Sequence, residues 1–214
     1  MKNNLTELVF VLDKSGSMAP LVSDTVGGFN GMVEKQKRVD GECLVTTVLF
    51  SDGSRIIHDR KRLCDIAPLT EQDYAVGGGT ALLDAIGDTI RHIGEIHKYA
   101  RPEDVPAHTM VVITTDGMEN QSRKYTYSGI KKLVEQKKEQ GWDFVCLGAN
   151  MDAISAAESI GISADRAANF HADSFGVAAM DDDICDLISL LRGGGTVDSG
   201  WKKNTEADYR NRKK

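Results

Sequence analysis

The chain has 214 residues, of which 41% are hydrophobic and 27% are charged, and this balance indicates a globular domain rather than a fibrous or disordered chain. Its 26 basic and 32 acidic residues give a net charge of −6, which argues against a nucleic-acid-binding protein with a basic face. No apolar run approaches the roughly 18 residues of a membrane span, and no signal peptide precedes the first strand-like run. We therefore expect a cytoplasmic protein that does not contact a membrane.

The first predicted element is a buried strand over residues 5–12, LTELVFVL, which is short and rich in β-forming residues. The polar segment DKSGSM follows it, and a helix is then predicted because apolar residues recur at helical spacing, at Val22, Val26, Phe29 and Val33. A second strand is predicted over residues 43–50. The turn at Ser51–Gly53 allows residues 55–58 to pair with that strand as a hairpin.

The second half of the chain continues to alternate between the two kinds of element. Three glycines at 77–79 precede Thr80, which stands where the N-cap of an apolar, helix-periodic stretch over 82–93 is expected. The remaining predicted elements are strands over 108–114, 142–147 and 167–170, and helices over 126–139, 152–160 and 175–191. This alternation is typical of a doubly wound, mostly parallel sheet with helices on both faces.

Beyond the last predicted helix, glycines at 193–195 open a basic tail. Residues 201–214 hold six Lys or Arg against two acids. We expect one domain over residues 1–192 and a flexible, solvated tail over 193–214, with a contact to nucleic acid or membrane as the alternative for the tail. The cysteines form neither a CxxC pair nor a disulfide framework, and we expect Cys43 and Cys146 to be buried and Cys64 to be exposed.

A candidate metal site begins directly after the first strand, where Asp13, Ser15 and Ser17 place oxygen side chains at alternate positions in a short loop. Oxygen-only ligands suit hard cations such as Mg²⁺, Mn²⁺ or Ca²⁺. Thr80 and Asp116 also fall at predicted junctions, and a parallel sheet brings such junctions to the same edge. Each segment has a simpler interpretation, because Asp13 or Ser15 can cap a helix, Thr80 can do the same, and Asp116 can form a turn.

Three motifs together resemble the von Willebrand factor type A domain and its metal-ion-dependent adhesion site. They are LVFVLDKSGSM, GGGTAL and VVITTDGMEN, and they match the family pattern of D-x-S-x-S, a lone Thr, and a lone Asp in a T-D-G context. The resemblance covers roughly residues 5–190 and is closest to bacterial, intracellular, single-domain members. It implies a six-stranded sheet in the order 3-2-1-4-5-6, with the hairpin strand after Ser51–Gly53 as the antiparallel edge.

The resemblance also implies the role of each site residue. Ser15 and Ser17 would bind the ion directly, Thr80 directly or through water, and Asp13 and Asp116 largely through water. The ion, Mg²⁺ first and Mn²⁺ or Ca²⁺ as alternatives, would then accept a Glu or Asp carboxylate from a protein partner. The implied function is a metal-dependent protein–protein interaction module, an adaptor in a larger intracellular assembly, and not an enzyme.

Two other functions are weighed against this one. A phosphatase of the haloacid-dehalogenase type also has an Asp after its first strand, but it needs a second Asp where this chain has Ser15. A metal-free scaffold is the other alternative. The chain contains no G-x-S-x-G elbow and no P-loop lysine.

Several polar residues outside the five-residue set receive simpler interpretations. Glu119 and Asn120 are close enough to Asp116 to line the rim of the site or to support its ligands from behind, and Lys14 is expected to be solvated. The acidic run Asp181–Asp183 is expected near a helix N-terminus or on a solvated face rather than at a second metal site. No histidine is assigned a chemical role.

Overall fold

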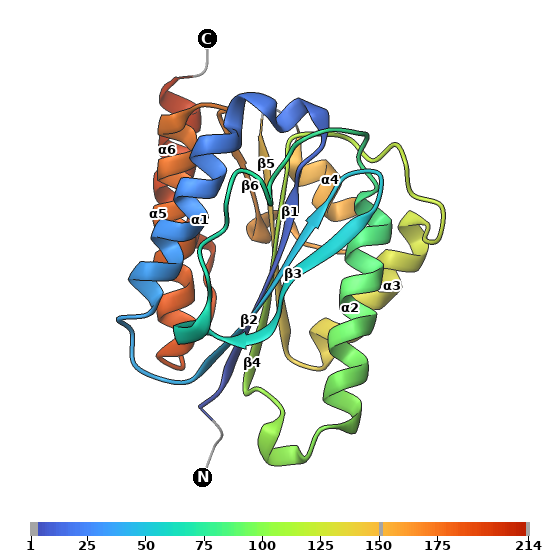
Figure 1. The fold of residues 1–214 in the computed structure, drawn as a ribbon, viewed down its shortest axis with the longest axis vertical. Helices are drawn as coiled ribbons and strands as arrows, with labels where there is room; N and C mark the ends of the chain where they lie inside the picture. The colour runs from blue at the N-terminus through green and yellow to red at the C-terminus, as the bar shows by residue number, and fades with distance from the viewer. Residues whose placement is uncertain (1–3, 150–151, 213–214) are drawn as a thin grey trace.

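The computed structural model describes residues 4–149 and 152–212. A six-stranded sheet in the order β3-β2-β1-β4-β5-β6 forms the middle layer (Figure 1). Only the β2–β3 pair is antiparallel among the pairs of this sheet in the described chain. The predicted doubly wound sheet, its strand order and its antiparallel edge are therefore confirmed. The strands are β1 (Thr6–Asp13), β2 (Cys43–Phe50), β3 (Ser54–Arg62), β4 (His108–Thr115), β5 (Trp142–Ala149) and β6 (Ala167–Phe170).

Helices cover both faces of the sheet (Figure 1). One face carries α1 (Val22–Gln36) and α5 (Ser174–Arg192), with α6 (Lys203–Asn211) beside α5, and the other carries α2 (Leu82–Tyr99), α3 (Tyr127–Glu139) and α4 (Ala153–Ser159). Short 3-10 helices occupy Gly16–Leu21, Leu63–Asp65, Pro102–Asp104, Ala164–Arg166 and Ser199–Lys202.

Two hydrophobic cores result from this layering. Side chains of β1 alternate between them, with Leu8 and Phe10 in the core under α1 and α5, and Val9 and Val11 in the core under α2 and α3. Because a central parallel strand is buried on both faces, it reads as a continuous apolar run in the sequence. Cys43 and Cys146 are buried and Cys64 is exposed, as predicted.

A buried charged side chain, Glu7, lies near the start of this central strand. Glu7 has no exposed surface, and its carboxylate accepts hydrogen bonds from Arg60 Nε at 2.7 Å and faces His97 Nε2 at 2.5 Å. Arg60 has a φ of 45°, a left-handed conformation that is uncommon for a residue other than glycine. The cluster links the edge strand β3 and the end of α2 to β1 because a buried carboxylate requires polar partners.

The C-terminal segment differs from the flexible tail expected from its charge. Residues 199–211 are helical, and α6 packs against both α5 and β6. Trp201 is 8% exposed and donates its indole N–H to the Asp165 carbonyl, while Thr205 is 1% exposed. Of the basic residues in this segment, Lys203 and Arg210 are exposed, whereas Lys202 is 7% exposed and donates to the carbonyls of Ala164 and Ala167; residues 213–214 lie outside the described residues.

The acidic run Asp181–Asp183 falls in the middle of α5 rather than near its N-terminus, and of the three residues only Asp182 lies exposed on a solvated face. Asp183 is 1% exposed and accepts four hydrogen bonds from the backbone and side chains of Asn204 and Thr205. Its carboxylate therefore satisfies free N–H groups at the start of α6, which is the role of a helix cap supplied from another helix. No helix in the described ranges is both long and apolar enough to cross a bilayer.

Candidate metal centre

The five residues predicted to bind a metal lie in loops at one end of the sheet, the upper end in Figure 1. Asp13 is the last residue of β1, and Ser15 and Ser17 follow it into the 3-10 helix Gly16–Leu21. Asp116 follows β4 directly, and Thr80 stands in the loop before α2. Because β1 and β4 are adjacent parallel strands, their carboxyl ends bring Asp13 and Asp116 to the same edge.

Asp13 is the buried base of this group. Its side chain has no exposed surface, and both carboxylate oxygens accept hydrogen bonds, Oδ1 from Ser15 N at 2.7 Å and Oδ2 from Thr115 Oγ1 at 2.6 Å. The bond to Ser15 fixes the turn at the end of β1, and the bond to Thr115 ties that turn to the neighbouring strand. The buried Asp13 carboxylate therefore fixes the loop that carries Ser15 and Ser17 to the end of β4.

The hydroxyl groups stand above Asp13 and lie close to one another. Ser15 Oγ and Ser17 Oγ are 3.2 Å apart, and Ser17 Oγ donates to Asp116 Oδ1 at 2.7 Å. A Cβ built on Gly117 would lie 3.1 Å from Thr80 Oγ1 and 3.7 Å from Ser17 Oγ. The hydroxyls of Thr80 and Ser17 therefore both lie beside Gly117, next to Asp116. The structure thus brings all five predicted residues together, from three segments of the chain.

Thr80 is held by the loop that follows Asp116 and does not cap α2. The N-cap of α2 is Ala81, which makes no side-chain cap hydrogen bond. Instead Thr80 N donates to Asn120 Oδ1 at 2.9 Å, and Asn120 N donates to the Thr80 carbonyl at 3.0 Å. Glu119 accepts from Leu83 N at 2.9 Å and so satisfies the first turn of α2. Glu119 and Asn120 are therefore supports of the Thr80 segment rather than rim residues alone.

Further hydrogen bonds hold the Asp13 loop against the end of β2 and against the segment that precedes Thr80. Lys14 N donates to the Phe50 carbonyl, Gly16 N donates to the Gly78 carbonyl at 3.1 Å, and the Tyr74 hydroxyl donates to the Asp13 carbonyl. Gly78 has a φ of 79°, and a Cβ there would lie 2.4 Å from Asp52 Oδ2, so a side chain would be both strained and crowded. The glycine run therefore permits close approach of the two loops.

Residues that the sequence motifs did not identify also hold this site. Thr115, Tyr74 and Asp52 bond to Asp13 or to the glycine-rich loop. Thr115 stands within the TTDG motif, where its position one residue before Asp116 could have pointed to it. Nothing in the spacing of Tyr74 or Asp52 points to the site, because both contacts depend on how the loop folds back.

The electrostatics of the site favour a cation. Burial raises the pKa of Asp13, with a smaller contribution from the negative charge of Asp116, and burial also raises the pKa of Asp116. Across residues 4–149 and 152–212, no salt bridge includes either carboxylate. Lys14, the nearest lysine in sequence, donates its Nζ to the Ala75 carbonyl at 3.1 Å.

The donor set fits a hard divalent ion better than a soft one. It consists of two carboxylates and three hydroxyls and contains no nitrogen or sulfur ligand. The described residues include no cluster of three or more His, Cys, Asp or Glu side chains suited to a metal, and the present group holds only two such side chains. A hydroxyl-rich site for Mg²⁺ is compatible with both observations, whereas a zinc site of the Cys and His type is not.

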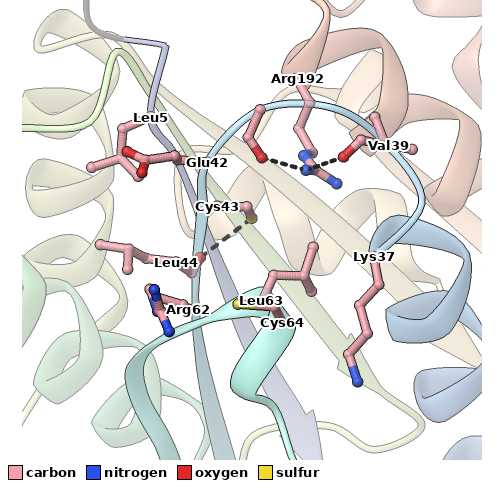
Figure 2. A pocket seen from close by; sticks show the side chains of 11 residues that line it. Leu5, Lys37, Val39, Glu42, Cys43, Leu44, Arg62, Leu63, Cys64 and Arg192 are labelled. Atoms are coloured by element: carbon pink, nitrogen blue, oxygen red, sulfur yellow. Dashed lines mark hydrogen bonds between the residues drawn. The ribbon is translucent and has the colours of Figure 1, made fainter.

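A separate cavity of about 320 Å³ lies at the opposite end of the sheet, near the amino ends of β1 and β2 (Figure 2). Lys37, Arg62 and Arg192 line it, which suggests an anion site. Arg192, however, is 5% exposed and donates to the carbonyls of Gln36, Val39 and Gly41. The most buried cation of this cavity therefore closes the end of α1 and does not face a ligand.

Comparison with known proteins identifies the fold. No family model matches the sequence, and no curated protein matches it. The proximal thread matrix protein 1 of the mussel byssus, solved with a zinc-occupied MIDAS motif, is similar with a TM-score of 0.61 and 16% identity over 86% of this chain and 46% of its own. A von Willebrand factor type A protein from Catenulispora acidiphila has a TM-score of 0.60 and 16% identity over 88% of this chain and 43% of its own.

A third similar structure is the vWF domain of the type V pili tip protein Mfa5 from Porphyromonas gingivalis. Its TM-score is 0.64, with 11% identity over 90% of this chain and 98% of that domain. The present chain spans less than half the length of the mussel and Catenulispora proteins. These likenesses show that the fold is that of von Willebrand factor type A domains.

Proposed function

We propose that Asp13, Ser15, Ser17, Thr80 and Asp116 hold a divalent cation, and that the chain uses it to bind a protein partner through an acidic side chain. The observation that carries the proposal is the convergence of these five oxygen-bearing side chains at the carboxyl edge of the sheet, where Ser17 bonds Asp116 and Asp13 supports Ser15. Mg²⁺ is the first candidate, with Mn²⁺ and Ca²⁺ as alternatives, because every donor is oxygen.

The chemistry of the donors explains why such a site would bind a carboxylate. Three of the five side chains are neutral hydroxyls, so the protein offsets a divalent charge only in part. When bound, the ion supplies positive charge that attracts an anionic ligand. Ser17 is exposed, whereas Asp13 and Ser15 are buried, so the accessible side of the group is the one that carries Ser17 and Asp116.

The similar structures support a binding role in general terms. They include a byssus matrix protein with zinc in its MIDAS motif and a pilus tip domain. We extend this to an adaptor in a larger intracellular assembly, which recognises a Glu or Asp on its partner. A nucleic-acid or membrane partner is not proposed.

The phosphatase alternative is disfavoured by the position of Asp13. A nucleophilic carboxylate needs a free oxygen facing the substrate. Asp13 has no exposed surface, and Ser15 N and Thr115 Oγ1 occupy its two oxygens. The residue two positions later is Ser15, which cannot act as the general acid that this chemistry requires.

The proposal is tested first by metal binding. Isothermal titration of chelator-treated protein with Mg²⁺ is expected to show one saturable site that Asp13→Ala abolishes. Asp40→Ala is the matched control, because Asp40 is an exposed carboxylate in the loop before β2, at the other end of the sheet. Absence of saturable binding of Mg²⁺, Mn²⁺ or Ca²⁺ to the unmodified chain would leave only the metal-free scaffold.

The second test concerns the partner. Proteins captured on the immobilised chain in Mg²⁺ are compared with those captured in EDTA and on the Asp13→Ala variant. A true partner is released by EDTA, and replacement of its contacting Glu or Asp by the amide is expected to abolish binding. Equal binding of the amide variant in Mg²⁺ would show that the carboxylate mechanism is wrong.

A further inference from the structure

A groove of about 690 Å³ opens directly beside Asp116. Its lining comes from the loop that follows β4, the first residues of α2 and α3, and helix α4, and it includes Asp116 and Gly117. The groove and the proposed metal centre therefore share Asp116, so a segment bound at the metal centre lies beside the groove. The other lining residues are Leu82, Met118, Glu119, Tyr127, Asp152, Ser155, Ala156, Ser159 and Ile160.

The lining contains large apolar side chains that are open to solvent. Met118 is 77% exposed and Tyr127 is 44% exposed, and both belong to this groove. Beneath them Leu82 and Ile160 are 5% and 1% exposed, so the floor is continuous with the core under α2 and α4. Exposed large apolar groups that gather in one concavity mark a binding surface more often than isolated ones do.

The charge of the groove has one sign. Asp116, Glu119 and Asp152 contribute carboxylates, and its lining among the described residues includes no Lys, Arg or His. The Glu119 carboxylate already accepts hydrogen bonds from the backbone N–H groups of Leu83, Gln121 and Ser122. Asp152 is exposed, and hydrogen bonds from Ser155 lower its pKa, so it presents a negative charge at the α4 end.

From this arrangement we infer that the groove takes a segment of the protein partner that carries a large apolar side chain and a basic side chain beside its metal-binding acid. The inference rests on the proposed function, since the acid is placed by the metal centre. The apolar side chain packs between Met118 and Tyr127, and the basic side chain lies towards Asp152. The groove thus selects among acidic segments, which a cation alone would not distinguish.

Selection from a library of random short peptides tests this directly. The folded full chain is immobilised and the library is selected in Mg²⁺ and, in parallel, in EDTA. In Mg²⁺ we expect enrichment of peptides that combine Glu or Asp with a large apolar residue and with Lys or Arg. In EDTA that combination is not expected to be enriched.

Variants then assign each preference to its side chain. For a peptide selected in Mg²⁺, Met118→Ser is expected to weaken binding about tenfold, because the apolar side chain loses its packing surface. Asp152→Asn keeps a helix-capping side chain and is expected to weaken only peptides that retain the basic residue, by roughly threefold. Tyr99→Ser is the matched control, since Tyr99 is 76% exposed at the end of α2, away from the groove.

The outcomes separate the two proposals. Acidic peptides enriched in Mg²⁺ without an apolar preference, or unchanged affinity in Met118→Ser, would refute the groove while leaving the metal-dependent function intact. No enrichment of acidic residues in Mg²⁺ over EDTA would refute the proposed function, and the groove inference with it. Apolar enrichment that is equal in Mg²⁺ and EDTA and independent of acid would also refute the coupling between the two sites.

Discussion

Replacing Asp116 by asparagine should leave the chain as stable or more stable without Mg²⁺ and make it less stable with Mg²⁺. Asparagine keeps an oxygen that can accept from Ser17 Oγ, as Asp116 Oδ1 does at 2.7 Å. It removes one of two buried or half-buried carboxylates that lie close enough for the charge of Asp116 to raise the pKa of Asp13. Without metal the variant is therefore expected to be as stable as the unmodified chain, or more stable by about 1 kcal/mol.

In Mg²⁺ we expect the unmodified chain to be more stable than the Asp116→Asn variant. Mg²⁺ bound at the proposed site is expected, at a concentration a hundredfold above its Kd, to stabilise the folded chain by about 2.7 kcal/mol. For a chain of 214 residues this corresponds to a rise in Tm of about 5–11 °C, at about 2–4 °C per kcal/mol. Asp116→Asn loses a charged donor, so a tenfold weaker affinity would remove about 1.4 kcal/mol of that gain.

Differential scanning calorimetry in EDTA and in Mg²⁺ measures both quantities on one sample, and Asp40→Asn serves as the control for loss of an exposed carboxylate. If Asp116→Asn lowers Tm equally in EDTA and in Mg²⁺, Asp116 is a structural residue and the reasoning is wrong. If the unmodified chain shows no change in Tm with any of Mg²⁺, Mn²⁺ or Ca²⁺, the same conclusion extends to the whole site.

Three further predictions concern the α1–α5–α6 side of the molecule. Gly28→Ala should lower the free energy of unfolding, because the new Cβ would lie 1.7 Å from Asp181 Oδ2. The Cβ of Gly27→Ala meets nothing within 4 Å, so this variant should raise the free energy of unfolding by about 1 kcal/mol. Urea unfolding measures both values, and equal gains in the two variants would contradict the contact with Asp181. Burial raises the pKa of Asp181 from 3.8 to about 7, so the folded chain binds a proton that the unfolded chain releases, and stability should fall as pH rises from about 4 to about 7. Asp181→Asn should abolish that fall and add about 1–2 kcal/mol at pH 8. Asp186→Asn, with an exposed side chain on the same helix, should leave the fall unchanged; an equal loss of pH dependence in both variants would refute the assignment. Asp183→Ala should lower the free energy of unfolding by about 2–3 kcal/mol and speed amide hydrogen exchange in α6, because the first residues of α6 lose their hydrogen-bond acceptor. Unchanged exchange in α6 would show that Asp183 does not stabilise that helix.

The fold was largely predictable because two simple signals agree along most of the chain. Buried strands such as β1 and β4 are continuous apolar runs, and α2 has apolar residues at helical spacing. The C-terminal segment was not predictable from the same signals. Its composition is polar, and its order depends on long-range contacts of Trp201, Lys202 and Thr205 with residues before and within β6 and α5.

The site was predictable to the level of its five main residues but not to the level of their supports. Asp13, Ser15 and Ser17 share one loop, so their proximity follows from local spacing alone. The bond between Thr80 and Asn120 joins residues 40 positions apart, and the bond between Thr115 and Asp13 joins residues 102 apart. Such contacts depend on how loops fold over the sheet edge, and no periodicity in the sequence encodes them.

The two ends of the sheet show why charge alone does not identify a binding site. At the amino end, Arg192 is a buried cation beside a cavity, but four backbone or side-chain oxygens of Gln36, Val39 and Gly41 accept from its terminal nitrogens. At the carboxyl end, Ser17 and Asp116 bond mainly to each other within the described chain, and Ser17 is exposed. A buried charge whose partners are backbone carbonyls stabilises a loop, because those partners cannot leave without exposing unsatisfied groups. Side chains that bond to one another can exchange that contact for an ion, and this difference favours the carboxyl end as the place where a ligand binds.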